Sequence, residues 1–553
     1  MRSTFMGLEA SKRGLFTQQS ALYTTGHNIS NANSVGYSRQ RVNMEPTLGY
    51  PGIGLDTPKT PGFIGTGVQA SAVERVRDSF VDKQFRQETN KLGYWEARSH
   101  SITQMEDIVN EPSDYGLAKA MDEFWNSLQD LHVNPEDGGA RAVVVQRGIA
   151  VADSFNYMYN SIKQLKDNAG EEIGILLKEA NSILEQIASI NEQIIAVEPN
   201  GFMPNDLYDA RDNLIDQLST YFPVEIEHVK SGGNSLAIAE GSLTVSLKLK
   251  DGNTIKLVDG KDFVQLRNSG VDTETDGITP KGMITGLHIV KVNEDRSETP
   301  LSNDWSTNTM TVNDINNFNS LGKYKGLVDS YGYRSGYDSN GLPIEKGLYS
   351  EMLVNLDIMA SEFAKEFNRI HQLGTDLSGV KGQNFFVEKD SIDPTDASAV
   401  DKITAQNIYV SQNLINDPSL IAASSSQEIE DVNNPGVFLP NPEPGNGKNA
   451  LNLSNVKFAK IGALEDVSVQ TYFEGLIGQL GVDGQQASRL QYNAATLQQA
   501  VTERRASVSS VSLDEEMTNM ISFQQAYNAN ARMITVIDET LDKIINGMGR
   551  VGL

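Results

Sequence analysis

Apolar residues recur every seven positions along residues 513–548, near the C-terminus. A second register begins four residues later at Met517, and it is half polar because it contains Gln524 and Asp538. No glycine or proline interrupts the pattern before Gly547, so the spacing predicts one helix about 54 Å long at 1.5 Å per residue. The first register predicts an apolar contact face on this helix, formed by Leu513, Met520, Tyr527, Ile534, Leu541 and Met548.

The N-terminal residues carry a similar narrow stripe, at Met1, Leu8, Leu15, Leu22 and Ile29. Such a stripe can cover the protein's own core, as on an ordinary amphipathic helix. Neither terminal stripe is wide enough to bury well alone, however, and helices gain most of their stability from tertiary packing. We therefore expect the two terminal helices to pair with each other and with copies of themselves in neighbouring chains.

Between the two ends the pattern changes from helical to period two and back to helical. After Pro223 short β-rich runs alternate with turn residues, and the Asp251-Gly252 pair is a strong hairpin signal. These runs predict strands at residues 224–229, 236–238, 243–249 and 254–258.

The sequence therefore predicts a multidomain α+β protein whose two ends form one module and whose other domains are inserted between them. The terminal helical module would comprise residues 1–45 and 505–553, in a coiled-coil-like pair, and a Gly/Pro-rich extended connection would follow at 46–77. The expected inner parts are a helical bundle (78–222, 336–373 and 451–504), an inserted β domain (223–335) and an irregular insert or small subdomain (374–450).

Charge and composition exclude several classes of protein. The chain has a net charge of −26, while its two ends are close to neutral: residues 1–50 hold five Lys/Arg and two Asp/Glu, and residues 505–553 hold four and six. An acidic middle argues against nucleic-acid binding. The absence of cysteine excludes disulfides and thiolate metal sites. No apolar run is long enough for a membrane-spanning helix, and the first 20 residues lack the apolar stretch of a cleavable signal peptide.

Motifs for catalysis, cofactors or metals are not found in the sequence. The six histidines are scattered, and no nucleophile elbow or phosphate loop occurs. Asp209, Arg211 and Asp212 resemble an acid pair with an arginine, but we interpret them as ion pairs on a surface helix. We therefore expect no enzyme activity and no cofactor.

Two longer motifs carry a family resemblance. HNISNANSVGYSRQ at residues 27–40 resembles the N-terminal signature of bacterial flagellar rod, hook and hook-associated proteins, and LDEEMTNMISFQQAYNANAR at residues 513–532 resembles their C-terminal signature. The YSRQ segment after Gly36 favours the hook-associated members, because rod and hook proteins usually continue with Gly-Phe. Ser34 and Val35 depart from the Thr-Pro that is common there. The motif residues of the N-terminal signature are Asn28, Ser30, Asn31, Asn33, Gly36 and Tyr37.

The resemblance implies a structural subunit of a ring that joins the flagellar hook to the filament. It implies export through the flagellar secretion apparatus to the outside of the cell, with the terminal helices forming the inner tube through the heptad residues of both ends. The implied partners are copies of the chain, the hook protein, a second junction hook-associated protein and an export chaperone that binds the C-terminal region. Two alternatives stay open: a hook or rod subunit, and a secreted surface-binding protein or adhesin that acts through the β insert.

Overall fold

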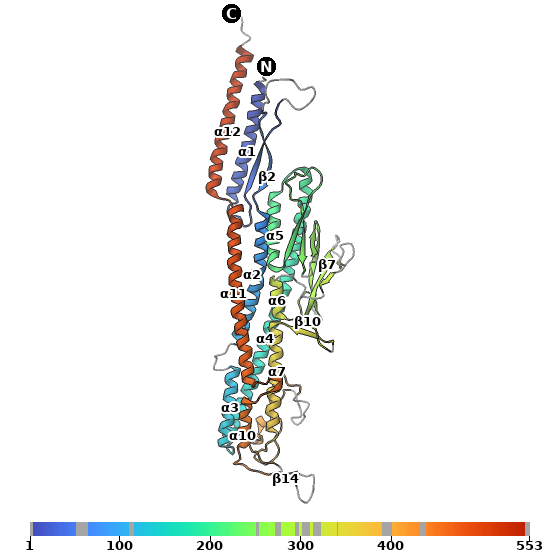
Figure 1. Cartoon of the computed structure of the whole chain (residues 1–553), viewed down its shortest axis with the longest axis vertical. Helices are drawn as coiled ribbons and strands as arrows, with labels where there is room; N and C mark the ends of the chain where they lie inside the picture. The colour runs from blue at the N-terminus through green and yellow to red at the C-terminus, as the bar shows by residue number, and fades with distance from the viewer. Residues whose placement is uncertain are drawn as a thin grey trace.

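Both ends of the chain lie at the same end of an elongated molecule in the computed structural model (Figure 1). The predicted class, a multidomain α+β protein with paired terminal helices, is confirmed. The structure describes residues 4–50, 65–109, 116–249, 254–270, 278–292, 298–300, 310–312, 322–339, 341–389, 401–427, 429–430 and 438–547.

The terminal module consists of two antiparallel helices and a β-hairpin. Helix α1 (Thr4–Ser30) packs along α12 (Leu513–Asp542), which ends in a π-helical turn (Lys543–Gly547). A Cβ atom added at Gly14 of α1 would lie only 2.9 Å from the side chain of Asn530, so the two helices approach closely there. Strands β1 (Gln40–Pro46) and β2 (Val68–Arg75) pair antiparallel and lie beside α1, where the sequence predicted only an extended connection from residue 46.

Helices α2 (Ser79–Val109) and α11 (Val469–Ser509) continue from the terminal module and pack along each other. The C-terminal helical pattern is broken before α12, because Ser510 and Ser512 have extended backbone conformations. The side chain of Ser512 accepts a hydrogen bond from the backbone N–H of Glu515 and so caps the new helix. The break lies at the level where the terminal module meets the rest of the molecule (Figure 1).

The helical bundle is organised around α4 (Gly138–Val197), a helix of 60 residues. The other bundle helices are α3 (Leu117–Val133), α5 (Asn205–Tyr221), α6 (Lys323–Tyr331) and α7 (Leu348–His371), and a 3-10 turn (Glu198–Asn200) follows α4. At the end far from the termini, aromatic rings in tilted and edge-to-face contacts fill the core. Phe124, Trp125, Phe363, Phe367, Phe385 and Phe386 form this cluster, with ring centroids 4.9–6.4 Å apart.

The inserted sheet packs against α4 through hydrogen bonds as well as apolar contacts. Asn191 donates to the carbonyl oxygen of Leu243 and accepts from its N–H, and Asn181 does the same with Leu266. The strands lie in the order β11-β10-β7-β6-β5-β4-β3, with β8 and β9 on β7. They are β3 (Val224–Val229), β4 (Ser242–Lys248), β5 (Thr254–Asp259), β6 (Asp262–Gly270), β7 (Ile284–Val292), β8 (Glu298–Pro300), β9 (Met310–Val312), β10 (Tyr333–Tyr337) and β11 (Pro343–Lys346).

Two sequence expectations differ from the observed β region. The strand predicted at residues 236–238 is wrong, because the segment turns and the N–H of Ala239 donates to the carbonyl oxygen of Leu236. A run of three apolar residues is too short to distinguish a strand from a packed turn. Helix α6 also lies inside the range expected to be only β, and β10 and β11 extend beyond its expected end at residue 335.

Residues after α7 build the far end of the molecule from short elements. A small hairpin of β12 (Phe386–Glu388) and β13 (Ile408–Val410) packs on α7 and α4. The remaining short elements are α9 (Gln412–Asn416), η3 (Pro418–Leu420), β14 (Ile429–Glu430), β15 (Phe438–Leu439), α10 (Lys448–Ser454), η4 (Asn455–Phe458) and η5 (Gly462–Leu464).

His371 is fully buried and holds this end together. One ring nitrogen, Nδ1, donates to the carbonyl oxygen of Gln383 at 2.6 Å, and Nε2 accepts from the N–H of Ala422 at 3.0 Å. Only the neutral ring can make both bonds at once, because a protonated Nε2 can no longer accept the N–H of Ala422. Burial is the main reason that the pKa of His371 is lowered to about 4; the bond to Gln383 opposes this shift and the nearby Arg141 adds to it.

We predict that acid weakens this end of the bundle between about pH 6.5 and pH 4. An unfolded histidine has a pKa of about 6.5 and binds a proton first, so this contribution, about 3 kcal/mol, is fully present above pH 6.5 and is lost as the pH falls towards 4. Denaturant unfolding at pH 7 and pH 5, followed by hydrogen exchange at Ala422, measures the loss. Replacing the exposed His100 by Gln should leave this loss of stability between pH 7 and pH 5 unchanged. An unchanged exchange rate at Ala422 would contradict the prediction.

Candidate functional site

The hydrophobic core stops where the terminal module begins. The large cluster of buried apolar residues extends from the bundle into the inserted sheet, and among the described residues its members lie between Ala97 and Ala487. No described residue of α1, the β1–β2 hairpin or α12 belongs to it. The connection between the terminal module and the bundle, which we call the joint, is therefore formed mainly by polar and charged side chains.

Asn28 is the first component of the joint. It is 1% exposed, and its amide makes four hydrogen bonds. The nitrogen donates to the carbonyl oxygen of Gln40 at 2.8 Å and to Glu516 at 3.1 Å. The oxygen accepts from the Tyr37 hydroxyl at 2.8 Å and from the N–H of Gln40 at 3.0 Å. One side chain thus ties α1, the following loop, β1 and α12 together, and its hydrogen-bonding capacity is used completely.

Arg39 makes a second link to the C-terminal helices. Its guanidinium contacts Glu516 at 3.0 Å and Glu515 at 2.7 Å, and its backbone N–H donates to the carbonyl oxygen of Ser509 at 2.9 Å. Glu516 is almost completely buried, and its carboxylate is paired with Arg39 and Asn28. The first turn of α12 is therefore held in place by the segment that follows α1.

The loop after α1 docks on the start of α5. The Ser38 hydroxyl donates to Asp209 at 2.6 Å, and the Ser38 N–H donates to the same carboxylate at 3.0 Å. Gly36 has a φ of +79°, which favours glycine, and a Cβ at this position would lie 1.9 Å from the side-chain oxygen of Asn213. The glycine of the motif is therefore explained by both backbone conformation and close approach.

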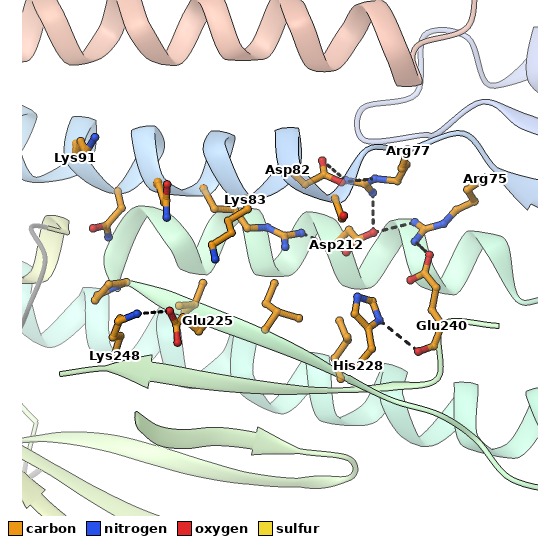
Figure 2. Close-up of a pocket in the computed structure, with 18 residues that line it drawn as sticks. Arg75, Arg77, Asp82, Lys83, Lys91, Asp212, Glu225, His228, Glu240 and Lys248 are labelled. Carbon is orange, nitrogen blue, oxygen red and sulfur yellow. Dashed lines mark hydrogen bonds and ion pairs between the residues drawn. The ribbon is translucent and has the colours of Figure 1, made fainter. Parts of the chain in front are cut away.

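A buried arginine–carboxylate network lies beside this loop (Figure 2). Asp212 of α5 accepts from three arginines: Arg75 at 2.9 Å, Arg77 at 2.7 Å and Arg86 at 3.3 Å. The Arg75 side chain is only 4% exposed, and it also contacts Asp209 at 2.7 Å. Strand β2 and helices α2 and α5 meet in this network.

Arg505 connects the same network to the C-terminal half of the chain. Its guanidinium contacts Asp82 of α2 and Asp216 of α5, both at 2.7 Å, and lies over the ring of Phe85. Asp82 also pairs with Arg77 at 2.9 Å, and Asp216 pairs with Arg86 at 2.6 Å. The charges are thus shared in a closed network rather than in separate pairs.

The electrostatics of Asp212 show how strongly the network is coupled. Burial alone raises the pKa of a carboxyl group. Around Asp212 the positive charges of Arg77, Arg75, Arg86 and Arg211 outweigh burial, so the pKa of this carboxyl is well below its usual value. The carboxylate therefore stays ionised at any pH at which the protein works, and its charge offsets that of the buried guanidinium groups.

The sequence interpretation of Asp209, Arg211 and Asp212 as ion pairs was right about the charge pairing but wrong in placing them on the surface of a helix. All three side chains are buried. Asp209 and Asp212 pair with arginines from β2 and α2, whereas Arg211 pairs with Glu240 at 3.0 Å and donates to the carbonyl oxygen of Gly241. The proximity of these charges within four residues indicated charge pairing within a helix, but the partners come from elsewhere in the chain.

The N-terminal heptad residues lie differently from the expectation. Leu8, Leu15, Leu22 and Ile29 are only half-buried, and Met1 lies outside the described residues. The buried face of α1 is shifted and consists of small or polar residues, which permit close packing. Its buried members are Gly14, Thr17, Ala21, Thr24, Thr25 and Asn28.

The C-terminal heptad residues lie closer to the expectation. Met520, Tyr527, Ile534 and Leu541 are half-buried, whereas Leu513 is exposed and Met548 lies outside the described residues. In the second register Met517, Gln524, Asp538 and Ile545 are exposed. The single chain thus uses one side of α12 against α1 and leaves another side open.

The remaining motif residues have local roles. Asn31 donates to the carbonyl oxygen of His27, and Ser30 to that of Gly26, so both end α1. Asn33 is exposed. Tyr37 contacts His27 as well as Asn28, with Nδ1 of His27 and the hydroxyl 2.9 Å apart. Of the six motif positions, Asn28, Gly36 and Tyr37 thus belong to the joint.

Sequence reasoning missed the arginines of the network. Arg75 and Arg77 stand at the end of β2, Arg86 lies in α2, and Arg505 lies in α11, near the other end of the chain. Nothing in their local spacing indicates that they meet at Asp212 and Asp216. The cluster Arg75, Arg77 and Arg86 in an acidic chain was the available signal.

The described part of the chain offers neither a group of three or more His, Asp or Glu side chains suited to a metal ion nor a helix long and apolar enough to cross a membrane.

Comparisons with known proteins place these features in a family. A family profile described as the flagellar hook-associated protein FlgK helical domain matches residues 102–386, and one described as the flagellar basal body rod FlgEFG protein C-terminal matches residues 504–547. Flagellar hook-associated protein 1 of Bacillus subtilis is 41% identical over 99% of both chains. The Salmonella typhimurium protein of the same name is 26% identical over 96% of this chain and 98% of its own.

A solved structure agrees with the fold. The flagellar hook junction protein FlgK from Burkholderia pseudomallei aligns with a TM-score of 0.55 at 16% identity, over 77% of this chain and 100% of that one.

We predict that Asp212→Asn loosens the joint while the bundle core stays folded. The amide cannot neutralise the three buried arginines, and removing one partner of a buried ion pair typically costs about 3–5 kcal/mol. Hydrogen exchange should accelerate across residues 36–40 and 505–512, and the sites around Trp125 should not change. Asp107→Asn, at an exposed position of α2, is the control. Equal exchange in both variants would contradict a structural role for the network.

We predict that Gly36→Ala weakens the docking of the loop on α5. A non-glycine residue in the left-handed region costs about 1–2 kcal/mol, and the new Cβ also displaces Asn213. Asn213→Ala in the same chain should restore only the part due to the clash. Thermal unfolding of the two single variants and the double variant separates the contributions. Complete rescue in the double variant would show that backbone conformation contributes nothing.

Proposed function

The chain belongs to the flagellar hook-associated protein 1 family, and from this premise we propose that it is a structural subunit at the junction between the flagellar hook and filament. The full-length similarity to relatives of that name supports the role. The protein would be exported through the flagellar secretion apparatus and located outside the cell. The hook or rod subunit and the adhesin are disfavoured by the family to which the chain belongs.

The observation that carries an assembly role is the open apolar side of α12. Leu513, Met517 and Ile521 follow at intervals of four and share one side of its first turns, and Met533 and Val536 are neighbours further along. All five are 46–57% exposed in the single chain. Exposed apolar groups of this extent on one helix mark a surface that another protein covers.

Helix α1 contributes further exposed aromatic groups to the same module. Phe5, Phe16 and Tyr23 are 62%, 55% and 80% exposed. We infer that copies of the terminal module pack against one another through these residues, the heptad residues of both helices and the open side of α12. Copies of the chain in a ring, the hook protein and a second junction hook-associated protein are the proposed neighbours.

The same surface suits an export chaperone before assembly. An apolar helix side that stays open in the single chain needs protection until neighbours cover it. We propose that the chaperone binds the C-terminal region for this reason. We also propose that the protein has a structural role without catalysis, which the ion pairs that neutralise the charged groups of the joint support.

We predict that Val536→Asp abolishes assembly without disturbing the single chain, because Val536 is 51% exposed there and would be buried only between copies. Ile534→Asp or Leu541→Asp should also abolish assembly, but by opening the α1–α12 pair, with the inserted domains still folded. Filament attachment and motility measure assembly, and near- and far-ultraviolet circular dichroism of the exported chain measures folding.

Ser522→Asp is the matched control, since it adds the same charge at an exposed polar position of α12. Motile cells with attached filaments in the Val536→Asp strain would argue against this surface as the contact. A globally unfolded chain in the Ile534→Asp strain would show instead that the terminal pair is needed for folding of the whole protein.

A further inference from the structure

A long groove lies beside the joint, between helix α2 and the strands β3 and β4 (Figure 2). Its volume is about 1110 Å³. Arg75, Arg77 and Asp212 of the joint close one end, and Lys91 and Lys248 line it further along.

One wall of the groove is an unpaired sheet edge. Strand β3 stands at the end of the strand order, and among the described residues it pairs only with β4. In an antiparallel pair alternate residues direct their N–H and C=O groups away from the partner strand. Half of the backbone groups of β3 therefore face outward, and an extended chain can add to such an edge.

The groove provides side-chain contacts for such a chain. Val224 and Ile226 of β3 are half-buried beside the buried Leu243, and they form an apolar part of the lining. On the opposite wall Lys83 and Lys91 follow at positions i and i+8 on one side of α2, with Gln87 between them. All three are exposed. An added strand would thus meet apolar groups on one side and lysines on the other.

The charge of the lining is opposite to that of the chain. Six lysine and arginine side chains and four carboxylates line the groove, whereas the whole chain has a net charge of −26. The arginines are neutralised within the joint, and Lys248 contacts Glu225 at 2.5 Å. Lys91 pairs with the nearby Glu88, and no described acidic side chain pairs with Lys83. Lys83 is thus the charge that remains for a ligand, and Lys91 is held only by a half-exposed pair within its own helix.

We propose that the groove receives an extended acidic segment of a neighbouring copy of this chain, which adds as a strand to the edge of β3. The inference rests on the proposed function, because copies must lie side by side. A second copy is the occupant because the chain is acidic between its ends, and a lysine-lined edge accepts such a segment while the rest of the surface repels it. Backbone hydrogen bonds would supply affinity, and Lys83 and Lys91 would select for carboxylates.

The natural absence of cysteine makes a clean test possible. Gln87→Cys, labelled with a benzophenone maleimide, places one photoreactive group inside the groove of the full-length chain. Flagella assembled from this chain are irradiated, and the products are separated by size and sequenced by mass spectrometry. The expected product is a covalent dimer of the chain, joined from residue 87 to an acidic segment of the second copy.

Charge reversal then tests the lysines. Lys83→Glu together with Lys91→Glu in the Gln87→Cys chain should lower the yield of the dimer at least fivefold. Lys163→Glu, at an exposed position of α4, should leave the yield within twofold. Circular dichroism and the thermal midpoint of each variant show whether the fold is kept; both α2 lysines are exposed, so we expect no change.

The outcomes separate the inference from the function on which it rests. Products within one chain, products with a different protein, or no product from a chain that immunogold labelling places at the hook-filament junction would each overturn the groove as a contact between copies. An equal yield of the dimer with and without the charge reversal would overturn the role of the lysines. Absence of the unlabelled natural chain from that junction would instead overturn the proposed function.

Discussion

The terminal module is attached to the rest of the molecule by buried charges rather than by apolar packing. Asp212 is surrounded by Arg75, Arg77 and Arg86, and Arg505 links the same network to α11. A buried ion pair contributes little net stability because desolvation offsets the attraction, but its geometry is specific. Two apolar surfaces can pack in several slightly shifted arrangements of similar energy. Each guanidinium here, by contrast, must meet its carboxylates at defined distances. The joint therefore specifies the direction in which the terminal helices leave the bundle.

The terminal pair itself follows a different rule. Small residues on α1 allow the helix to approach α12 closely, and Asn28 and Glu516 form a buried hydrogen bond between the two helices. Close approach leaves little apolar area between the two helices, because Gly14 and Ala21 have little or no side chain to bury. Most large apolar side chains of the module point elsewhere. A pair built in this way is weak alone and gains stability when neighbouring chains cover its open sides.

Periodicity predicted the elements well and their contacts less well. The five-heptad pattern identified α12, and the change of period after Pro223 identified the sheet, because both signals arise from burial repeated along one element. The stripe of Leu8, Leu15 and Leu22 did not identify the face of α1 that is buried within one chain, because hydropathy does not mark glycine and threonine as contact residues. Its role between copies stays a prediction. The sequence identified some residues of the joint as motif positions, but it did not show which elements they connect. Its arginines come from separate elements, and no local pattern records a contact between positions such as Asp216 and Arg505.

The position of the joint explains why the N-terminal motif combines residues of such different kinds. Gly36 is needed for a backbone turn against Asn213, Asn28 for four hydrogen bonds, and Ser38 for the carboxylate of Asp209. Each meets a different element, and together they bring α1, β1, α5 and α12 to one point. A segment that serves four elements has little freedom to change, whereas the surface of the inserted sheet has no such constraint. The edge of β3 lies at the boundary of these two regions, where a rigid wall formed by the joint meets an open strand. That combination of a fixed wall and unpaired backbone groups distinguishes a binding groove from an ordinary exposed edge.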